Sequence, residues 1–172
     1  VLLLVLYIFA VSITIYLNQI FGFYGYFFSV PLYLLAGASL HGICLFTHEG
    51  VHETLHKNTW INNLIGSLCG YVVLQTMAGY RVLHLKHHKY LNIEGDPGLL
   101  KTYVSNKYII TAMEWGYFLF GYVAFLSVIP YQGFKQGTKE DRLLITRDII
   151  FMILFIWLSL SLVPFEWLIH GW

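Results

Sequence analysis

The chain opens with a long apolar stretch that predicts two helices. Its first 47 residues contain no Asp, Glu, Lys or Arg. A helix that crosses the hydrocarbon core of a bilayer needs about 20 apolar residues, so this stretch has room for two such helices. The polar pair Asn18-Gln19 and the glycines after it separate them, which places one helix over residues 1–18 and the next over residues 24–47. Residues 1–47 are therefore predicted to form a transmembrane helical hairpin.

The next segment, residues 48–107, is polar and rich in histidine. Within it, residues 61–79 are apolar but interrupted by three glycines, so they indicate an interfacial or buried helix and not a complete span. Glycine and proline residues predict a loop over residues 89–106. The whole segment is expected to lie at the membrane interface.

Two further apolar stretches follow, over residues 108–129 and 147–163. A proline closes each of them, as prolines commonly do just beyond the end of a helix. The charged residues 131–146 between them predict a linker. Residues 108–163 are therefore expected to supply two further membrane helices, and residues 1–172 as a whole are expected to form one domain.

The composition of the chain is that of a membrane protein. Hydrophobic residues make up 58% of it and charged residues 11%, with a mean hydropathy of +0.65, whereas soluble domains carry about 25% charged residues. The predicted fold is therefore all-α, a multi-pass transmembrane helical bundle of an integral membrane protein surrounded by membrane lipids. The formal net charge of +1 indicates no nucleic-acid partner. Six of the ten Lys and Arg residues lie in residues 48–107, so the positive-inside rule favours the cytoplasmic side for this segment.

Histidines are concentrated in two clusters within the polar segment. The first is His48-Glu-Gly-Val-His52 and the second is His84-Leu-Lys-His87-His88. Residues three and four apart share one face of a helix, so each cluster can present its imidazoles to a metal ion. Imidazole nitrogen is a good ligand for Fe, Zn, Cu and Ni. The two clusters therefore predict a histidine-rich metal site at the membrane interface.

Three other residues are candidates for an extra ligand or for a contact behind the ligands. His41 lies two helical turns before His48, where a metal-directed role and a buried hydrogen bond are equally compatible with the pattern. Glu49 lies about 100° around the helix from His48 and can orient a histidine, as metal-bound imidazoles usually require. Asp96 follows the second cluster in a Gly-Asp-Pro turn, where it can do the same or act as a turn residue.

The first cluster also fits the zinc-protease signature H-E-x-x-H, in which two histidines bind zinc and the glutamate activates water. A membrane-embedded zinc metalloprotease that uses His48, Glu49 and His52 is therefore the alternative function. A zinc site with three protein ligands has no use for a second cluster of three histidines 32 residues further on. A metal transporter or sensor is disfavoured as well, because transporters place their ligands near the bilayer midplane.

The order of these features resembles the membrane fatty acid desaturase superfamily, which has an apolar hairpin, H-x-x-x-H, a partly apolar segment, H-x-x-H-H and then further spans. The segments HEGVHETLHKNTWINNLIG and RVLHLKHHKYLNIEGDPG around the two clusters are similar to bacterial acyl-lipid desaturases. Carotenoid ketolases and hydroxylases and alkane hydroxylases are related to these enzymes. The resemblance covers most of residues 23–172.

This resemblance implies an O₂-dependent oxidoreductase with two non-haem iron ions. Such an enzyme introduces a double bond into the acyl chain of a lipid or hydroxylates a related apolar chain, with electrons from a ferredoxin or a cytochrome-type donor. Acyl, sphingoid, carotenoid and alkane substrates are all compatible with the resemblance. It implies no catalytic groups beyond the metal ligands, which are His48, His52, His84, His87 and His88.

The superfamily also has a third histidine box, usually H-x-x-H-H, after the later spans. Nothing between His88 and Trp172 matches it. We expect that box to lie beyond Trp172, with the chain cut short before it, and we expect these 172 residues to be inactive alone.

Overall fold

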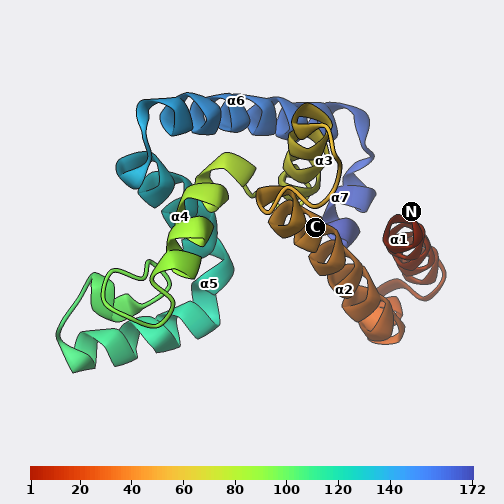
Figure 1. The fold of residues 1–172 in the computed structure, drawn as a ribbon. Helices are drawn as coiled ribbons and strands as arrows, with labels where there is room; N and C mark the ends of the chain where they lie inside the picture. Colours follow the sequence, from red (N-terminus) through yellow and green to blue (C-terminus); the bar gives the residue numbers. More distant parts are fainter.

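A computed structural model of the chain confirms the predicted all-α fold. It describes the backbone of residues 1–172 and the side chains of residues 1–116 and 126–172, and no strand occurs in the part of the chain so described. The helices in chain order (Figure 1) are α1 (Leu2–Phe21), η1 (Gly22–Tyr24), α2 (Gly25–Val51), α3 (Thr59–Tyr71), α4 (Met77–Lys89), η2 (Leu100–Thr102), α5 (Lys107–Gln136), α6 (Lys139–Leu162) and α7 (Phe165–Gly171).

The apolar helices α1 and α2 pack against each other as the predicted hairpin (Figure 1). Among the described residues, the segment Leu2–Val51 and helix α6 are long and apolar enough to cross a membrane. Large apolar side chains on them face outward, with Leu34 71% exposed and Leu160 63% exposed. Such surfaces suit a lipid environment, because a soluble monomer rarely exposes apolar patches of this extent. Helix α2 ends at Val51, beyond the predicted residue 47, so His48 lies on its last turn and His52 directly follows it.

The helix expected over residues 61–79 is instead divided into α3 and α4 by a turn at residues 72–76. Leu74 in this turn has a φ of 57°, a left-handed conformation that ends a helix. The backbone N–H of Gln75 then donates to the carbonyl oxygen of Gly70 at 2.8 Å. Because of this turn, α4 runs in a different direction from α3, and its second half approaches the end of α2. The predicted loop after α4 is confirmed, with only the short helix η2 inside it.

The charged linker predicted over residues 131–146 is almost entirely helical, so its predicted extent is wrong. Helix α5 continues through Pro130 to Gln136, and α6 begins at Lys139. Thr138 caps α6 through a reciprocal pair of hydrogen bonds with Asp141, which satisfies two backbone N–H groups at the helix start. A strong cap of this kind starts the next helix immediately, which leaves no room for an irregular linker.

The ends of α2, α3 and α4 meet in a tightly packed region. The hydroxyl of Thr47 on α2 donates to the carbonyl oxygen of Gly66 on α3 at 2.9 Å. Met77, the first residue of α4, is 2% exposed, and its side chain packs against Gly50 and Gly66. These contacts hold the end of α2 against the beginning of α4, which is the arrangement that a site shared between these helices requires.

Replacing Gly133 with alanine is expected to destabilise the protein by about 1–3 kcal/mol, the usual cost of overpacking. At this position α4 and α5 touch through their backbones, and an added Cβ would lie 2.7 Å from the carbonyl oxygen of Gly79 and 2.9 Å from its Cα. Gly116→Ala, also in α5, is the matched control, since nothing lies within 4 Å of its added Cβ and alanine is the better helix former. Thermal unfolding in detergent measures the difference, and equal melting temperatures for the two variants would contradict this packing.

Candidate metal centre

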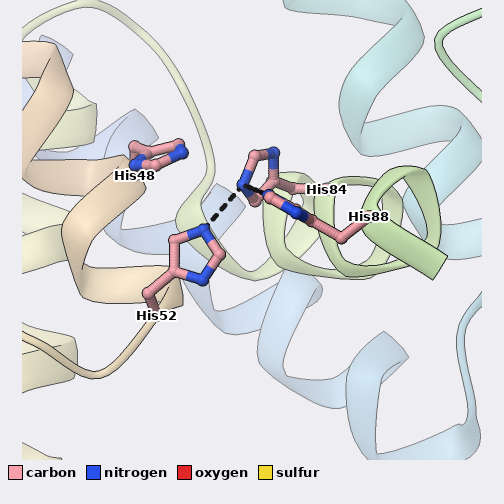
Figure 2. Close-up of side chains that lie close together, drawn as sticks. All are labelled: His48, His52, His84 and His88. Atoms are coloured by element: carbon pink, nitrogen blue, oxygen red, sulfur yellow. Dashed lines mark hydrogen bonds between the residues drawn. The ribbon is translucent and has the colours of Figure 1, made fainter. Parts of the chain in front are cut away.

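The two histidine clusters come together at the ends of two helices. His48 lies in the last turn of α2 and His52 directly follows that helix. His84, His87 and His88 lie in the second half of α4. Helix α2 is held against α4 by the packing at Met77, so clusters that are 32 residues apart in the sequence face each other (Figure 2).

Four of the five predicted ligands form one group: His48, His52, His84 and His88. One nitrogen from each lies within 4.8 Å of the others. His84 is at the centre, with its Nε2 2.9 Å from Nε2 of His52 and 3.0 Å from Nε2 of His88 (Figure 2). Two imidazole nitrogens at right angles on one metal ion, each at about 2.1 Å from it, lie about 3.0 Å apart. The two separations from Nε2 of His84 therefore fit nitrogens that share a metal ion.

Two histidines of this group, His84 and His52, are favoured as neutral imidazoles at pH 7. Burial, together with the neighbouring imidazoles of His48 and His88, lowers the pKa of His84 to about 4. Burial also lowers the pKa of His52, and the nearby His48 adds to this effect. Because a metal ion binds the neutral form of imidazole, it does not have to displace a proton from these two side chains at pH 7.

Glu49 lies behind His48, as the sequence suggested. Its Oε1 is 3.1 Å from Nδ1 of His48, and its Oε2 accepts a hydrogen bond from the hydroxyl of Thr54 at 2.7 Å. When the Nδ1–H of His48 donates to this carboxylate, its Nε2 is left for a metal ion. Both carboxylate oxygens of Glu49 are thus engaged, one with the candidate ligand His48 and the other with Thr54.

His87 points away from the group of four and towards the loop that follows α4. Its Nδ1 is 2.7 Å from Oδ1 of Asp96, whose side chain is fully buried. The ring centroids of His87 and His84 are 6.4 Å apart, compared with 4.5 Å for His88 and His84. With its Nδ1 held by Asp96, the ring nitrogen of His87 that can still bind a metal ion is Nε2.

Asp96 is the centre of a small hydrogen-bond network. Besides His87, its carboxylate accepts from the backbone N–H of Asn92 at 2.9 Å and of Gly98 at 2.7 Å. Burial opposes ionisation of this carboxyl, but the hydrogen bonds from His87, Asn92 and Gly98 outweigh it and hold the pKa below its usual value. Asp96 therefore does more than close a turn, because it fixes the ring of a candidate ligand.

The structure does not bring His41 to the histidine group. It is exposed on α2, seven residues before His48, which corresponds to about 10 Å along the helix axis. The remaining histidines are engaged elsewhere. Nδ1 of His56 accepts from the backbone N–H of Asn58, and Nδ1 of His170 is hydrogen-bonded to the hydroxyl of Tyr33 at 2.7 Å.

Sequence reasoning missed two residues that hold the end of α2 in place. The side-chain amide of Asn62, which is fully buried, donates to the carbonyl oxygen of Gly50 at 2.8 Å. Arg81 on α4 donates to the same oxygen at 3.2 Å. Asn62 also accepts from the backbone N–H of Leu55, so it fixes the turn that follows His52. For Asn62 the available signal was an amide side chain within a largely apolar helix.

A third missed residue is Tyr80, which lies one helical turn before His84. The two rings are stacked, with their centroids 4.9 Å apart and an angle of 25° between their planes. Tyr80 therefore restricts the orientation of the central imidazole of the group. The i, i+4 spacing between these two residues was visible in the sequence.

Comparison with known proteins gives one consistent result. The model of the fatty acid desaturase family matches residues 3–172. Among curated proteins, the chain is 32% identical over 63 residues to an sn-1 oleoyl-lipid 12-desaturase of Picosynechococcus, covering 37% of this chain and 18% of that protein. It is 40% identical over 76 residues to the dihydrorhizobitoxine desaturase of Bradyrhizobium elkanii, covering 42% of this chain and 21% of that protein.

A third relative is similar over a longer segment. The sn-1 acyl-lipid omega-3 desaturase (ferredoxin) of Nostoc is 28% identical over 111 residues, covering 63% of this chain and 30% of that protein. The chain thus matches less than a third of the length of each of these relatives. No solved structure matches it.

Proposed function

Because the chain belongs to the fatty acid desaturase family, we propose that the protein is a membrane-bound di-iron oxidoreductase that introduces a double bond into the acyl chain of a lipid. The observation that carries this proposal is the convergence of His48, His52, His84 and His88 from two helices, with nitrogens within 4.8 Å of one another. The names of the relatives support the same reaction class and a lipid substrate.

The donor set fits iron, for which imidazole is a suitable ligand. We assign the group of four histidines to one iron ion and His87, held by Asp96, to a second. Further histidines, of the kind that a third box supplies, would complete the set. When bound, the two irons would activate O₂ so that hydrogen can be removed from an unactivated C–H bond.

The proposed reaction is a desaturation that consumes O₂ and two external electrons. Two adjacent methylene groups lose one hydrogen atom each and become a double bond. O₂ is reduced to two molecules of water by these two hydrogen atoms together with two electrons and two protons. The electrons come from an external donor, for which a ferredoxin or a cytochrome-type protein is suitable. Transfer of one oxygen atom to the chain in place of the second hydrogen abstraction would give an alcohol, which is the hydroxylation variant.

The residues of this chain orient the ligands and control their protons. Glu49 holds the proton of His48 on Nδ1, and Asp96 does the same for His87. The lowered pKa of His84 favours its neutral form at pH 7, which is the form of imidazole that binds a metal ion. Carboxylates behind metal-bound imidazoles raise the basicity of the ligands and fix their orientation.

The membrane arrangement follows from the apolar helices. We propose that α1, α2 and α6 cross the bilayer in a multi-pass bundle, and that the histidine ends of α2 and α4 lie at the cytoplasmic interface. Membrane lipids would then surround the outward-facing side chains, such as Leu34 and Leu160. An acyl chain would approach the metal centre from within the bilayer.

The zinc metalloprotease is not favoured. The family match points to desaturases, and a zinc site would use three protein ligands where four imidazoles meet. Glu49, which would have to activate water, is hydrogen-bonded to His48 and Thr54.

Expression of the complete gene in a host that lacks the corresponding desaturase tests the proposal. We expect a new unsaturated fatty acid in the lipid fraction, detected by gas chromatography with mass spectrometry, and about two iron ions per purified chain. A purified protein that binds zinc in preference to iron, with an unchanged lipid profile, would contradict it.

A further inference from the structure

Asp148 is a buried carboxylate in the apolar helix α6, and its side chain is fully inaccessible to solvent. Its Oδ2 accepts a hydrogen bond of 2.8 Å from the backbone N–H of Ala78, in the first turn of α4. The two residues are 70 positions apart in the sequence. A buried carboxylate must have hydrogen-bond partners that offset its loss of hydration. The backbone N–H of Ala78 is one such partner for Asp148.

Helix α4 does not cap its own beginning with a side chain. Its N-cap residue, Thr76, makes no side-chain hydrogen bond to the helix. The first backbone N–H groups of a helix need acceptors, and a negative charge near them is stabilising. Asp148 meets both needs for α4, because it accepts from Ala78 and places a carboxylate at the positive end of the helix dipole.

The other carboxylate oxygen of Asp148 is also engaged. Its Oδ1 accepts from the hydroxyl of Tyr71, the last residue of α3, at 3.3 Å and from Arg147 at 3.0 Å. Burial, and then the charge of Asp148, raise the pKa of Tyr71 to about 12, so its hydroxyl remains a donor. One side chain on α6 therefore binds the end of α3 and the start of α4, on either side of the turn that separates them.

We propose that Asp148 is a positioning residue of the metal centre, which acts by fixing α4 relative to α6 and α3. Ala78 and His84 lie on the same continuous helix, six residues or about 9 Å apart along its axis. A shift or rotation of the first turn of α4 is therefore transmitted to His84, His87 and His88 without an intervening loop. Since ligand nitrogens must lie within a few tenths of an ångström of their places, such a shift changes the metal site.

This inference rests on the proposed metal centre, and its test uses metal binding instead of activity. Asp148→Asn keeps the shape of the side chain but removes its charge, and Asp148→Ala removes the cap. Asp141→Asn is the matched control on α6, because within the described part of the chain the Asp141 side chain is hydrogen-bonded only to Thr138, in the capping box. All variants are made in the complete protein, and Co²⁺ is the probe because its visible spectrum reports ligand geometry.

We expect Asp148→Ala to weaken Co²⁺ binding by about 10- to 100-fold, as the loss of an outer contact does in other metal sites, and to alter the Co²⁺ spectrum. Asp148→Asn should lie between this variant and the wild type, and it carries the test if Asp148→Ala does not accumulate. Asp141→Asn should bind Co²⁺ as the wild type does. A lower melting temperature alone, with wild-type Co²⁺ affinity and spectrum in both Asp148 variants, would overturn the positioning role. Wild-type protein that binds neither Co²⁺ nor iron would instead overturn the proposed function.

Discussion

Replacing His84 with alanine is expected to abolish metal binding and desaturase activity. His84 is the central imidazole, since its Nε2 lies 2.9 Å from that of His52 and 3.0 Å from that of His88. The substitution removes the nitrogen that lies next to those of both His52 and His88. The loss should exceed the roughly 10- to 100-fold that follows from the removal of an outer contact. Iron content by mass spectrometry and fatty-acid composition of the host both measure the effect.

His56→Ala is the matched control for this variant. His56 is exposed and accepts a backbone hydrogen bond from Asn58, outside the group of four. It should retain the iron content and activity of the wild type. Retention of iron by the His84 variant at the wild-type level would contradict the assignment of this histidine as a ligand.

Replacing Asp96 with asparagine should have the second largest effect. Three N–H groups, from His87, Asn92 and Gly98, converge on its fully buried carboxylate. An amide has one oxygen, so its NH₂ group would face one of these donors, and a buried donor without an acceptor costs about 1–3 kcal/mol. His87 would lose its fixed orientation, and we expect metal affinity to fall by about 10- to 100-fold.

The selective consequence of the Asp96 variant is the loss of one of two irons. His87 stands apart from the group of four, so the iron proposed for that group should remain bound. Iron stoichiometry and Mössbauer spectroscopy can distinguish one iron from two. Glu94→Gln removes a carboxylate from an exposed position in the same loop and serves as the control. Equal iron content in the two variants would show that Asp96 acts only as a turn residue.

Much of the candidate site could be predicted because its pattern is local. The spacing of His48 and His52, and of His84 and His88, depends only on the 3.6-residue period of an α-helix. The apolar runs likewise predicted α1, α2 and α6, because length and hydrophobicity of one segment suffice for that inference. Glu49 and Asp96 were found for the same reason, since each lies within nine residues of the histidine that it contacts.

The division of roles within the second histidine cluster depends on residues that are distant along the chain or lie in the loop after α4. His87 and His88 share a face with His84 equally well by spacing, and only the approach of α2 brings His88 into the group while His87 meets Asp96. The extent predicted for the linker after Pro130 was wrong for a local reason, because the capping box of Thr138 and Asp141 starts α6 at once.

The sequence by itself thus determined that the apolar helices α1, α2 and α6 form and which imidazoles lie on one side of a helix, because those properties arise from neighbouring residues. Only the tertiary structure decided how the helices meet. Gly50 is bound by Asn62 and Arg81, and Ala78 is bound by Asp148 from 70 residues away. These contacts are buried or partly buried hydrogen bonds between different helices. No local sequence pattern encodes the proximity of these segments, because it follows from how whole helices pack against one another.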